Sequence, residues 1–194
     1  MSVRKSVRRF SATIAVVLAV LTLGGTKAMA ASDNAAGRLG PLTELVVQRL
    51  QVSDQVAAAK FGTGKPIDDP VRERQELAEV RERAATLGID PDRTVSFFQD
   101  QIAASKVVQR GLFDRWTAHP DEAPTTRPDL NEIRAELDQL TTSLLGQLVA
   151  TDGVRRPGIT CRVEVTAAQL SAIVVDRLDA LHRNALRVAS RSVC

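Results

Sequence analysis

Apolar residues recur along most of this chain at intervals of three and four, the spacing of one face of an α-helix. Glycine, proline and aspartate interrupt that spacing and divide the pattern into segments. We expect helices over residues 41–60, 68–88, 91–118 and 128–150, and a last helical stretch over residues 163–192. Residues 119–128, HPDEAPTTRP, have the prolines and threonines of a connecting loop. The pattern therefore predicts an all-α fold, a bundle of five to six helices.

Capping residues support several of these boundaries. Asp68 is expected to cap the second helix and Gly88 to end it. Asp90 and Pro91 have the order of an N-cap followed by proline in the first helical turn. Composition agrees, because aromatic residues are only 3% of the chain and tyrosine is absent, which disfavours sheet.

The first 30 residues differ in character from the rest of the chain. Basic residues precede an apolar run over residues 12–25, and Ala28-Met29-Ala30 offers the small residues that signal peptidase accepts. We interpret residues 1–30 as a signal peptide, cleaved near Ala30, and residues 31–194 as one exported domain, periplasmic or secreted. The run is too short for a comfortable membrane span, which needs roughly 20 apolar residues.

Loss of this segment changes the charge. It contains five basic residues and no acidic one, so its removal changes the formal net charge from +3 to −2. The mature chain is then not basic, and we expect no nucleic-acid partner. No later segment approaches the length of a membrane span, so we expect no membrane partner after cleavage.

Two cysteines, Cys161 and Cys194, occur in a chain that leaves the reducing cytosol, which favours one disulfide. An unbroken helix over residues 163–192 would be about 45 Å long, but bonded cysteines have Cα atoms about 6 Å apart. The chain must therefore turn back, and we expect the turn over residues 174–176, with Asp176 capping the last helix. A metal site is not expected, because His119 and His182 belong to no ligand cluster and are expected at the surface.

Polar residues interrupt the apolar stripes of four helices. In the first helix, Arg49 and Lys60 are eleven residues apart and point the same way. In the third, Ser105 and Gln109 continue the apolar stripe one turn apart. The remaining polar positions of this kind are Arg134 in the fourth helix and Asp69, Arg72, Glu73 and Glu76 in the second.

Each of these residues has an ordinary structural explanation when taken alone. An arginine at the edge of a stripe usually extends its charge into water, and a core serine usually bonds a carbonyl one turn back. Trp116 reads as a core residue, and GTGK at residues 62–65 lacks the Ser or Thr of a phosphate loop. Together, however, several unpaired inward charges would cost several kcal/mol each, on the order of a buried ion. A ligand with more than one carboxylate would satisfy them.

The joint spacing of Arg49, Lys60, Asp69, Arg72 and Glu73, followed by Ser105 and Gln109, resembles that of the all-helical chorismate mutases. The late cysteines, the signal peptide and Arg134 resemble the secreted subclass. The resemblance covers residues 42–194. It implies rearrangement of chorismate to prephenate without a cofactor or a covalent intermediate, in a pocket built from one chain of a homodimer.

The resemblance also implies a role for each matching residue. Arg49 and Arg134 would hold the substrate carboxylates with help from Ser105, and Lys60 and Gln109 would donate hydrogen bonds to the ether oxygen. Asp69 and Glu73 would orient the ring hydroxyl, with Arg72 beside them. Glu76 departs from relatives that carry glutamine, and its carboxylate could weaken binding of a dianion unless it pairs with Arg72.

Two other functions are compatible with an exported helical domain. A binding or scaffold protein could keep the fold without catalysis, although it would have no reason to keep Lys60 and Gln109 beside two arginines. An exported chaperone would need an exposed apolar groove, which the balanced stripes do not suggest.

Overall fold

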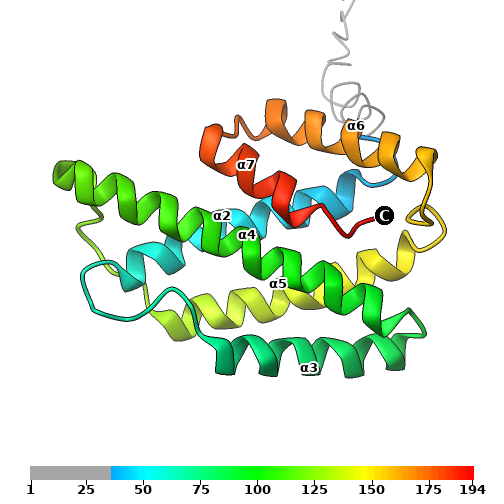
Figure 1. The fold of residues 1–194 in the computed structure, drawn as a ribbon, viewed down its shortest axis with the longest axis horizontal. Coiled ribbons are helices and arrows are strands. Elements are labelled where there is room, and N and C mark those ends of the chain that lie inside the picture. Colours follow the sequence, from blue (N-terminus) through cyan, green and yellow to red (C-terminus); the bar gives the residue numbers. More distant parts are fainter. Residues whose placement is uncertain (1–35) are drawn as a thin grey trace, which may run out of the picture.

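The structure, a computed structural model, describes residues 36–194. The proposed signal peptide lies outside this range. Six α-helices and one short 3₁₀ turn make up the fold, without strands in the described part of the chain (Figure 1). The elements are α2 (Gly40–Lys60), α3 (Pro70–Leu87), α4 (Pro91–Ala118), η1 (Pro120–Glu122), α5 (Leu130–Ala150), α6 (Ile159–Val175) and α7 (Ala180–Ala189). The predicted all-α class is confirmed.

Local capping explains where α3, α4 and α5 begin. Asp90 caps α4 as expected, its side chain accepting from the backbone N–H groups of the first turn. The prediction for α3 was wrong by one residue, because Asp69 and not Asp68 is the N-cap. Helix α5 begins at Leu130 after the cap Asp129, two residues later than predicted. In each case the capping carboxylate fixes the boundary.

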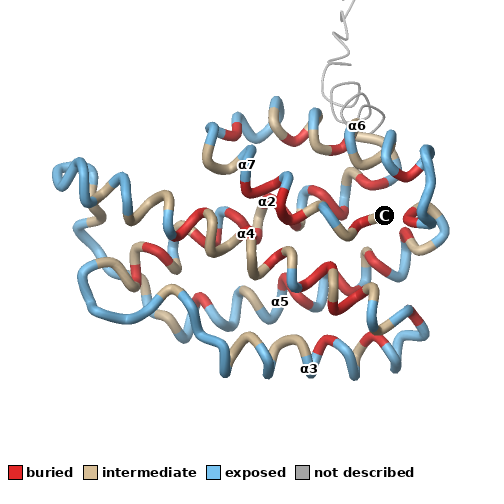
Figure 2. Tube along the Cα trace, in the orientation of Figure 1, coloured by how far each residue is buried: buried red, intermediate tan, exposed pale blue. Residues whose placement is uncertain are grey.

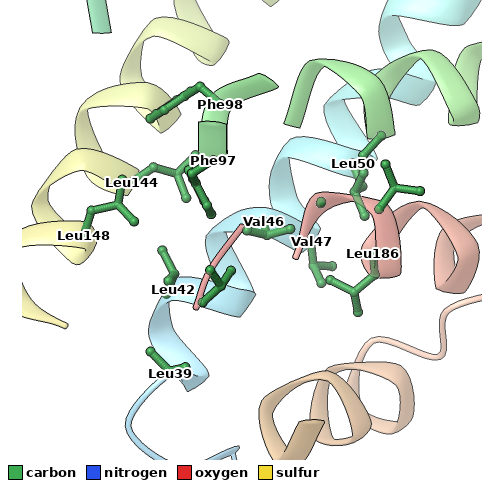
Figure 3. Packing of buried hydrophobic residues seen from close by; sticks show 14 of the residues in the cluster. Leu39, Leu42, Val46, Val47, Leu50, Phe97, Phe98, Leu144, Leu148 and Leu186 are labelled. Atoms are coloured by element: carbon green, nitrogen blue, oxygen red, sulfur yellow. The ribbon is translucent and has the colours of Figure 1, made fainter. Parts of the chain in front are cut away.

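Helix α2 is the central element of the bundle. It packs against α4, α5, α6 and α7, while α3 packs on α4 at the lower edge of Figure 1. The buried core joins side chains of α2, α4, α5 and α7 (Figure 3) and runs through the middle of the molecule (Figure 2). Its largest members include Leu42, Leu50, Phe97, Phe98 and Leu144. This packing holds α2, α4 and α5 in fixed relation to α3, which contributes Val80 and Ala84 to the same core.

Trp116 was expected in the core, but it is only half-buried. Its ring centroid lies 5.2 Å from that of Phe61, which also contacts Phe113 at 5.3 Å in an edge-to-face arrangement. These three rings form a small separate cluster where α2 ends, beside the far end of α4. The cluster helps to fix the position at which the chain leaves α2.

The disulfide forms as predicted, with Cys161 and Cys194 bonded and their Cα atoms 5.9 Å apart. The chain turns back between α6 and α7, but later than expected. Helix α6 runs from Ile159 to Val175, and Asp176 is its C-cap residue. Asp179 caps α7 instead, accepting from the N–H of His182.

Removal of the disulfide is expected to destabilise the fold. Replacing both cysteines with alanine should lower the free energy of unfolding by about 3 to 4 kcal/mol, because the bond closes a long loop in the unfolded chain. The cysteines are separated by 33 positions. Urea unfolding measures this change, and a reductant should weaken the parent protein but not the variant. Equal stability of parent and variant would contradict the expectation.

His182 was expected at the surface, but it joins α7 to α2. Its side chain is 13% exposed, and its ring nitrogens lie 3.0 Å from Asp54 Oδ1 and 2.8 Å from Asp179 Oδ1. The hydrogen bond to Asp54, opposed by burial and supported by Asp179, raises the pKa of His182 to about 9. The imidazolium is therefore the form that links the two helices at neutral pH.

This arrangement predicts a pH-dependent contribution to stability. A raised folded-state pKa stabilises the fold fully below the unfolded pKa, about 6.5, and the contribution is lost as pH rises through about 9. The difference in unfolding free energy between the parent and His182→Gln should fall by about 1 kcal/mol or more between pH 6 and pH 10. His119→Gln, at an exposed position, is the matched control. A difference that does not change with pH would argue against the ion pair.

Candidate functional site

A cavity of about 140 Å³ lies between α2, α3, α4 and α5, and the loop between α2 and α3 contributes to its wall. All nine polar residues that the sequence singled out line it: Arg49, Lys60, Asp69, Arg72, Glu73, Glu76, Ser105, Gln109 and Arg134. The apolar part of the wall is formed by Val56, Ile67, Ile102, Leu130, Ile133 and Leu137. The fold thus brings nine polar residues that are widely separated in the sequence to one cavity.

Arg49 is the most buried cation of this cavity, with 5% of its surface exposed. Its guanidinium forms an ion pair with Glu76 and donates to Thr141 Oγ1 at 3.2 Å. It also lies over the ring of Phe98, 5.9 Å from the centroid. The prediction that Glu76 would pair with Arg72 was wrong, since Glu76 reaches the buried arginine of α2 instead. Three contacts on separate helices fix the direction of this guanidinium.

Lys60 ends α2 and its ammonium enters the cavity. Its Nζ donates to the backbone carbonyl of Ile67 at 3.2 Å, which ties the loop between α2 and α3 to the cavity wall. Burial lowers the pKa of Lys60; Asp69 opposes this shift and the nearby charge of Arg134 adds to it. An anion placed beside Lys60 would therefore gain a partly dehydrated cationic donor.

Gln109 and Ser105 lie one turn apart on the inner side of α4. Gln109 is 4% exposed and its Nε2 donates to Ser105 Oγ at 3.1 Å. Ser105 in turn is bonded to Ser53 Oγ of α2 at 2.9 Å. The amide Nε2 carries a second hydrogen that this chain of contacts does not use. It is a neutral donor held in a fixed position at the cavity wall.

Asp69 and Glu73 build the start of α3. The Asp69 side chain accepts from the N–H of Arg72 at 3.1 Å, and Glu73 Oε1 accepts from the N–H of Asp69 at 3.1 Å. This reciprocal arrangement is a variant of the capping box. Both carboxylates therefore have a structural role, and both also border the cavity. The cap places the first turn of α3 against the site.

Lys106 also lines the cavity, and the sequence reasoning missed it. Its Nζ lies 2.7 Å from Glu73 and 3.0 Å from Asp68. Burial alone would lower the pKa of Lys106, but the hydrogen bonds to Glu73 and Asp68 outweigh it and raise that pKa. Lys106 follows Ser105 directly, so it points away from the apolar stripe, and no sequence spacing links it to residues 68 and 73. Its proximity to Ser105 was the only available signal.

The cavity has a surplus of positive charge. Five cations line it, namely Arg49, Lys60, Arg72, Lys106 and Arg134, against the three carboxylates of Asp69, Glu73 and Glu76. Two of those carboxylates are paired, Glu76 with Arg49 and Glu73 with Lys106. Arg72 and Arg134 form no ion pair with a described residue, and Arg134 donates only to Asn131 Oδ1 at 3.2 Å. The surplus of two charges complements a dianion.

The arrangement binds and orients rather than transfers protons. Arg49 on α2 and Arg134 on α5 suit two carboxylates, and Lys60 and Gln109 supply further donors to the same cavity. Among residues 36–194, no three His, Cys, Asp or Glu side chains are grouped so as to hold a metal ion. A small organic acid with two negative charges is the ligand that this set of donors fits best.

Comparison with known proteins identifies the family. The model of type II chorismate mutases matches residues 41–110, the part that contains most of the cavity. The chain is 37% identical to the secreted chorismate mutase of Mycolicibacterium smegmatis over 92% of this chain and 97% of that protein. This chain belongs to the chorismate mutase family.

Two further members of the family support this assignment. The secreted chorismate mutase of Mycobacterium tuberculosis is 32% identical over 81% of this chain and 78% of that protein. The crystal structure of the chorismate mutase of Burkholderia phymatum superimposes with a TM-score of 0.77 at 32% identity, covering 84% of this chain and 99% of that one. The agreement with chorismate mutases includes α6 and α7 as well as the four helices around the cavity. The alternative of a binding or scaffold protein that keeps the fold without catalysis is therefore not favoured.

Proposed function

We propose that this chorismate mutase rearranges chorismate to prephenate in the cavity between α2 and α5. The observation that carries the proposal is the cavity itself, where two arginines, a lysine and a buried glutamine surround one space with a surplus of two positive charges. Family membership supports the same reaction. Chorismate has two carboxylates, and the cavity offers two arginines to hold them.

In this proposal each polar residue has one task. Arg49 and Arg134 hold the carboxylates, assisted by Ser105, and Lys60 and Gln109 donate to the ether oxygen whose bond to carbon breaks. Asp69, Arg72 and Glu73 contact the ring hydroxyl side of the substrate. Lys106 neutralises Glu73, so that this carboxylate adds no uncompensated charge to a site for a dianion.

The reaction needs no proton transfer, and this explains the kind of residues present. As the carbon–oxygen bond breaks, negative charge grows on the ether oxygen, and fixed donors stabilise that charge more than they stabilise the ground state. The walls also confine a flexible dianion near its reactive shape, which removes internal rotations before the barrier. Rigid donors with few water competitors are what both effects require.

We further propose that residues 1–30 are cleaved and that residues 31–194 act outside the cytosol, as the names of the secreted relatives suggest. The resemblance implies a homodimer. One chain brings all nine expected polar residues to the cavity, so dimerisation would not be needed to assemble them. Sedimentation of the exported chain would give its oligomeric state, and N-terminal sequencing would give the cleavage position.

The reaction is tested by following the ultraviolet absorbance of chorismate with the purified exported chain and identifying the product by NMR. Prephenate formed at a rate proportional to protein concentration would support the proposal. A folded protein that binds chorismate and leaves it unchanged would instead favour the binding-protein alternative.

The Arg49–Glu76 ion pair leads to a prediction on substrate affinity. Glu76 competes with a substrate carboxylate for the same guanidinium, and its own charge repels the dianion. Glu76→Gln removes the charge and keeps an acceptor for Arg49, so KM should fall by about three- to tenfold with little change in kcat. Initial rates over a range of chorismate concentrations measure both constants.

Glu79→Gln is the matched control, because Glu79 lies one turn further along α3 with its side chain 69% exposed. It should leave KM unchanged. An increased KM in Glu76→Gln would show that the carboxylate positions Arg49 rather than competes for it.

A further inference from the structure

The outer side of α6 is unusually apolar for an exposed helix. Of the eight large hydrophobic side chains exposed in the described chain, five belong to α6. Ile159, Val163, Leu170 and Val174 are 60–76% exposed and recur at the spacing of one helical face. The opposite side of α6 packs against α2 and α7. A helix that is apolar on both sides is normally covered on both.

Exposed arginines are frequent on the two C-terminal helices. Six exposed arginines lie on or beside α6 and α7: Arg156, Arg162, Arg177, Arg183, Arg187 and Arg191. None of the six forms an ion pair with a described residue. Three of them, at positions 183, 187 and 191, follow one another at single-turn intervals along α7 and its C-terminal end. The basic side chains therefore remain available to an external anionic partner.

The charge of the chain is divided between its two parts. Residues 155–194 contain seven arginines and three acidic residues, whereas residues 36–154 contain fourteen basic and nineteen acidic residues. A net charge of −2 for the mature chain therefore hides a basic layer made of α6 and α7. This layer is the upper part of the molecule in Figure 1.

The apolar and the basic residues meet in one place. A cavity of about 230 Å³ between α6 and α7 is lined by Leu170, Ile173 and Leu186 together with Arg183 and Arg187. No acidic residue lines it. The lining thus joins an apolar floor to two guanidinium groups, which is the combination that an acyl chain below an anionic headgroup requires.

From this face we propose that the α6–α7 layer binds the surface of an anionic lipid bilayer, which would overturn the expectation that the mature chain has no membrane partner. The apolar stripe of α6 would lie at the level of the acyl chains and the arginines would contact the phosphates. A second copy fits less well, because two such basic faces would repel each other. No helix between Gly40 and Ala189 has the length and hydrophobicity to cross a membrane, so binding would be at the surface. The catalytic cavity, between α2 and α5, contains no residue of α6 or α7 and would stay open.

Flotation with lipid vesicles tests this proposal. The exported chain is mixed with vesicles of phosphatidylglycerol and phosphatidylcholine or of phosphatidylcholine alone. We expect flotation with the anionic vesicles only, weakened by salt. Combined Arg183→Gln and Arg187→Gln should reduce the partition coefficient roughly 25-fold, since each arginine near an anionic surface contributes about fivefold. Leu170→Asp should reduce it as well.

The controls separate this face from the rest of the surface. Arg74→Gln on α3 and Val149→Asp on α5 change exposed residues of the same kinds and should float like the parent protein. Chorismate turnover without vesicles should be equal in all these variants, so a failure of lipid binding is distinct from a failure of the proposed reaction. Equal flotation with both vesicle types, absence of flotation, or an unaffected arginine variant would overturn the proposal. A parent dimer that Leu170→Asp dissociates would also overturn it, by placing a second copy on this face.

Discussion

Lys60→Ala is expected to reduce kcat for chorismate by about 10²- to 10³-fold, the usual loss when one fixed donor to a developing oxyanion is removed. Lys60 carries a positive charge and is partly dehydrated by burial, and the charges of Asp69 and Arg134 also influence its ammonium. The electrostatic stabilisation that Lys60 provides increases as negative charge accumulates on the ether oxygen. KM should change much less than kcat, because the ether oxygen carries little charge in the bound substrate. Steady-state kinetics separates the two constants.

Lys65→Ala provides the control for this prediction. Lys65 is exposed in the loop after α2 and is not part of the cavity wall, so its removal should leave kcat unchanged. Circular dichroism and thermal unfolding establish that both variants fold. If Lys60→Ala raised KM and left kcat intact, the lysine would bind substrate without acting on the breaking bond.

Gln109→Glu is expected to convert a pH-independent enzyme into an acid-dependent one. The amide of Gln109 donates at any pH, so parent turnover should change little across neutral pH. The introduced glutamate could donate only when protonated, and its burial would raise its pKa. Activity should therefore be present below that pKa and be lost as pH rises through it, with a deficit of about 10²-fold or more at pH 8.

Gln109→Ala distinguishes this effect from a general loss of packing. It removes the donor at every pH, so its turnover should be low and should not recover in acid. A parent enzyme with a steep acid-only profile would count against a donor role for the amide. A Gln109→Glu variant with the parent's flat profile would do the same.

Local capping signals made most of the fold predictable. Asp90 and Pro91 are adjacent and fit only one arrangement, an N-cap followed by the first helical residue. Helix α4 therefore begins where it was expected. Where two carboxylates compete, the sequence could not choose between them. Asp68 and Asp69 are adjacent, and the deciding contacts are the attraction of Asp68 to Lys106 and Arg110 on α4 and the return hydrogen bond of Glu73 to Asp69. Asp176 and Asp179 present the same difficulty.

The candidate site was predictable in its members but not in its pairing. Helical spacing placed Arg49, Lys60, Ser105 and Gln109 on inward faces, and the cavity contains all four. Pairing depends on how helices approach each other, which spacing within one helix does not encode. Glu76 of α3 therefore pairs with Arg49 of α2, and Lys106, which lies beside the apolar stripe of α4, adds a cation that spacing did not indicate. The basic layer of α6 and α7 was missed because a net charge does not show where the charges lie.

The most direct test of the account compares chorismate turnover by the exported parent protein with that of Lys60→Ala and Gln109→Ala, in one assay and with folding verified. The account predicts rapid rearrangement by the parent and a loss of about 10²-fold or more in each variant. A parent that leaves chorismate unchanged would contradict the proposed reaction, and variants that keep the parent's kcat would contradict the placement of the ether-oxygen donors in this cavity.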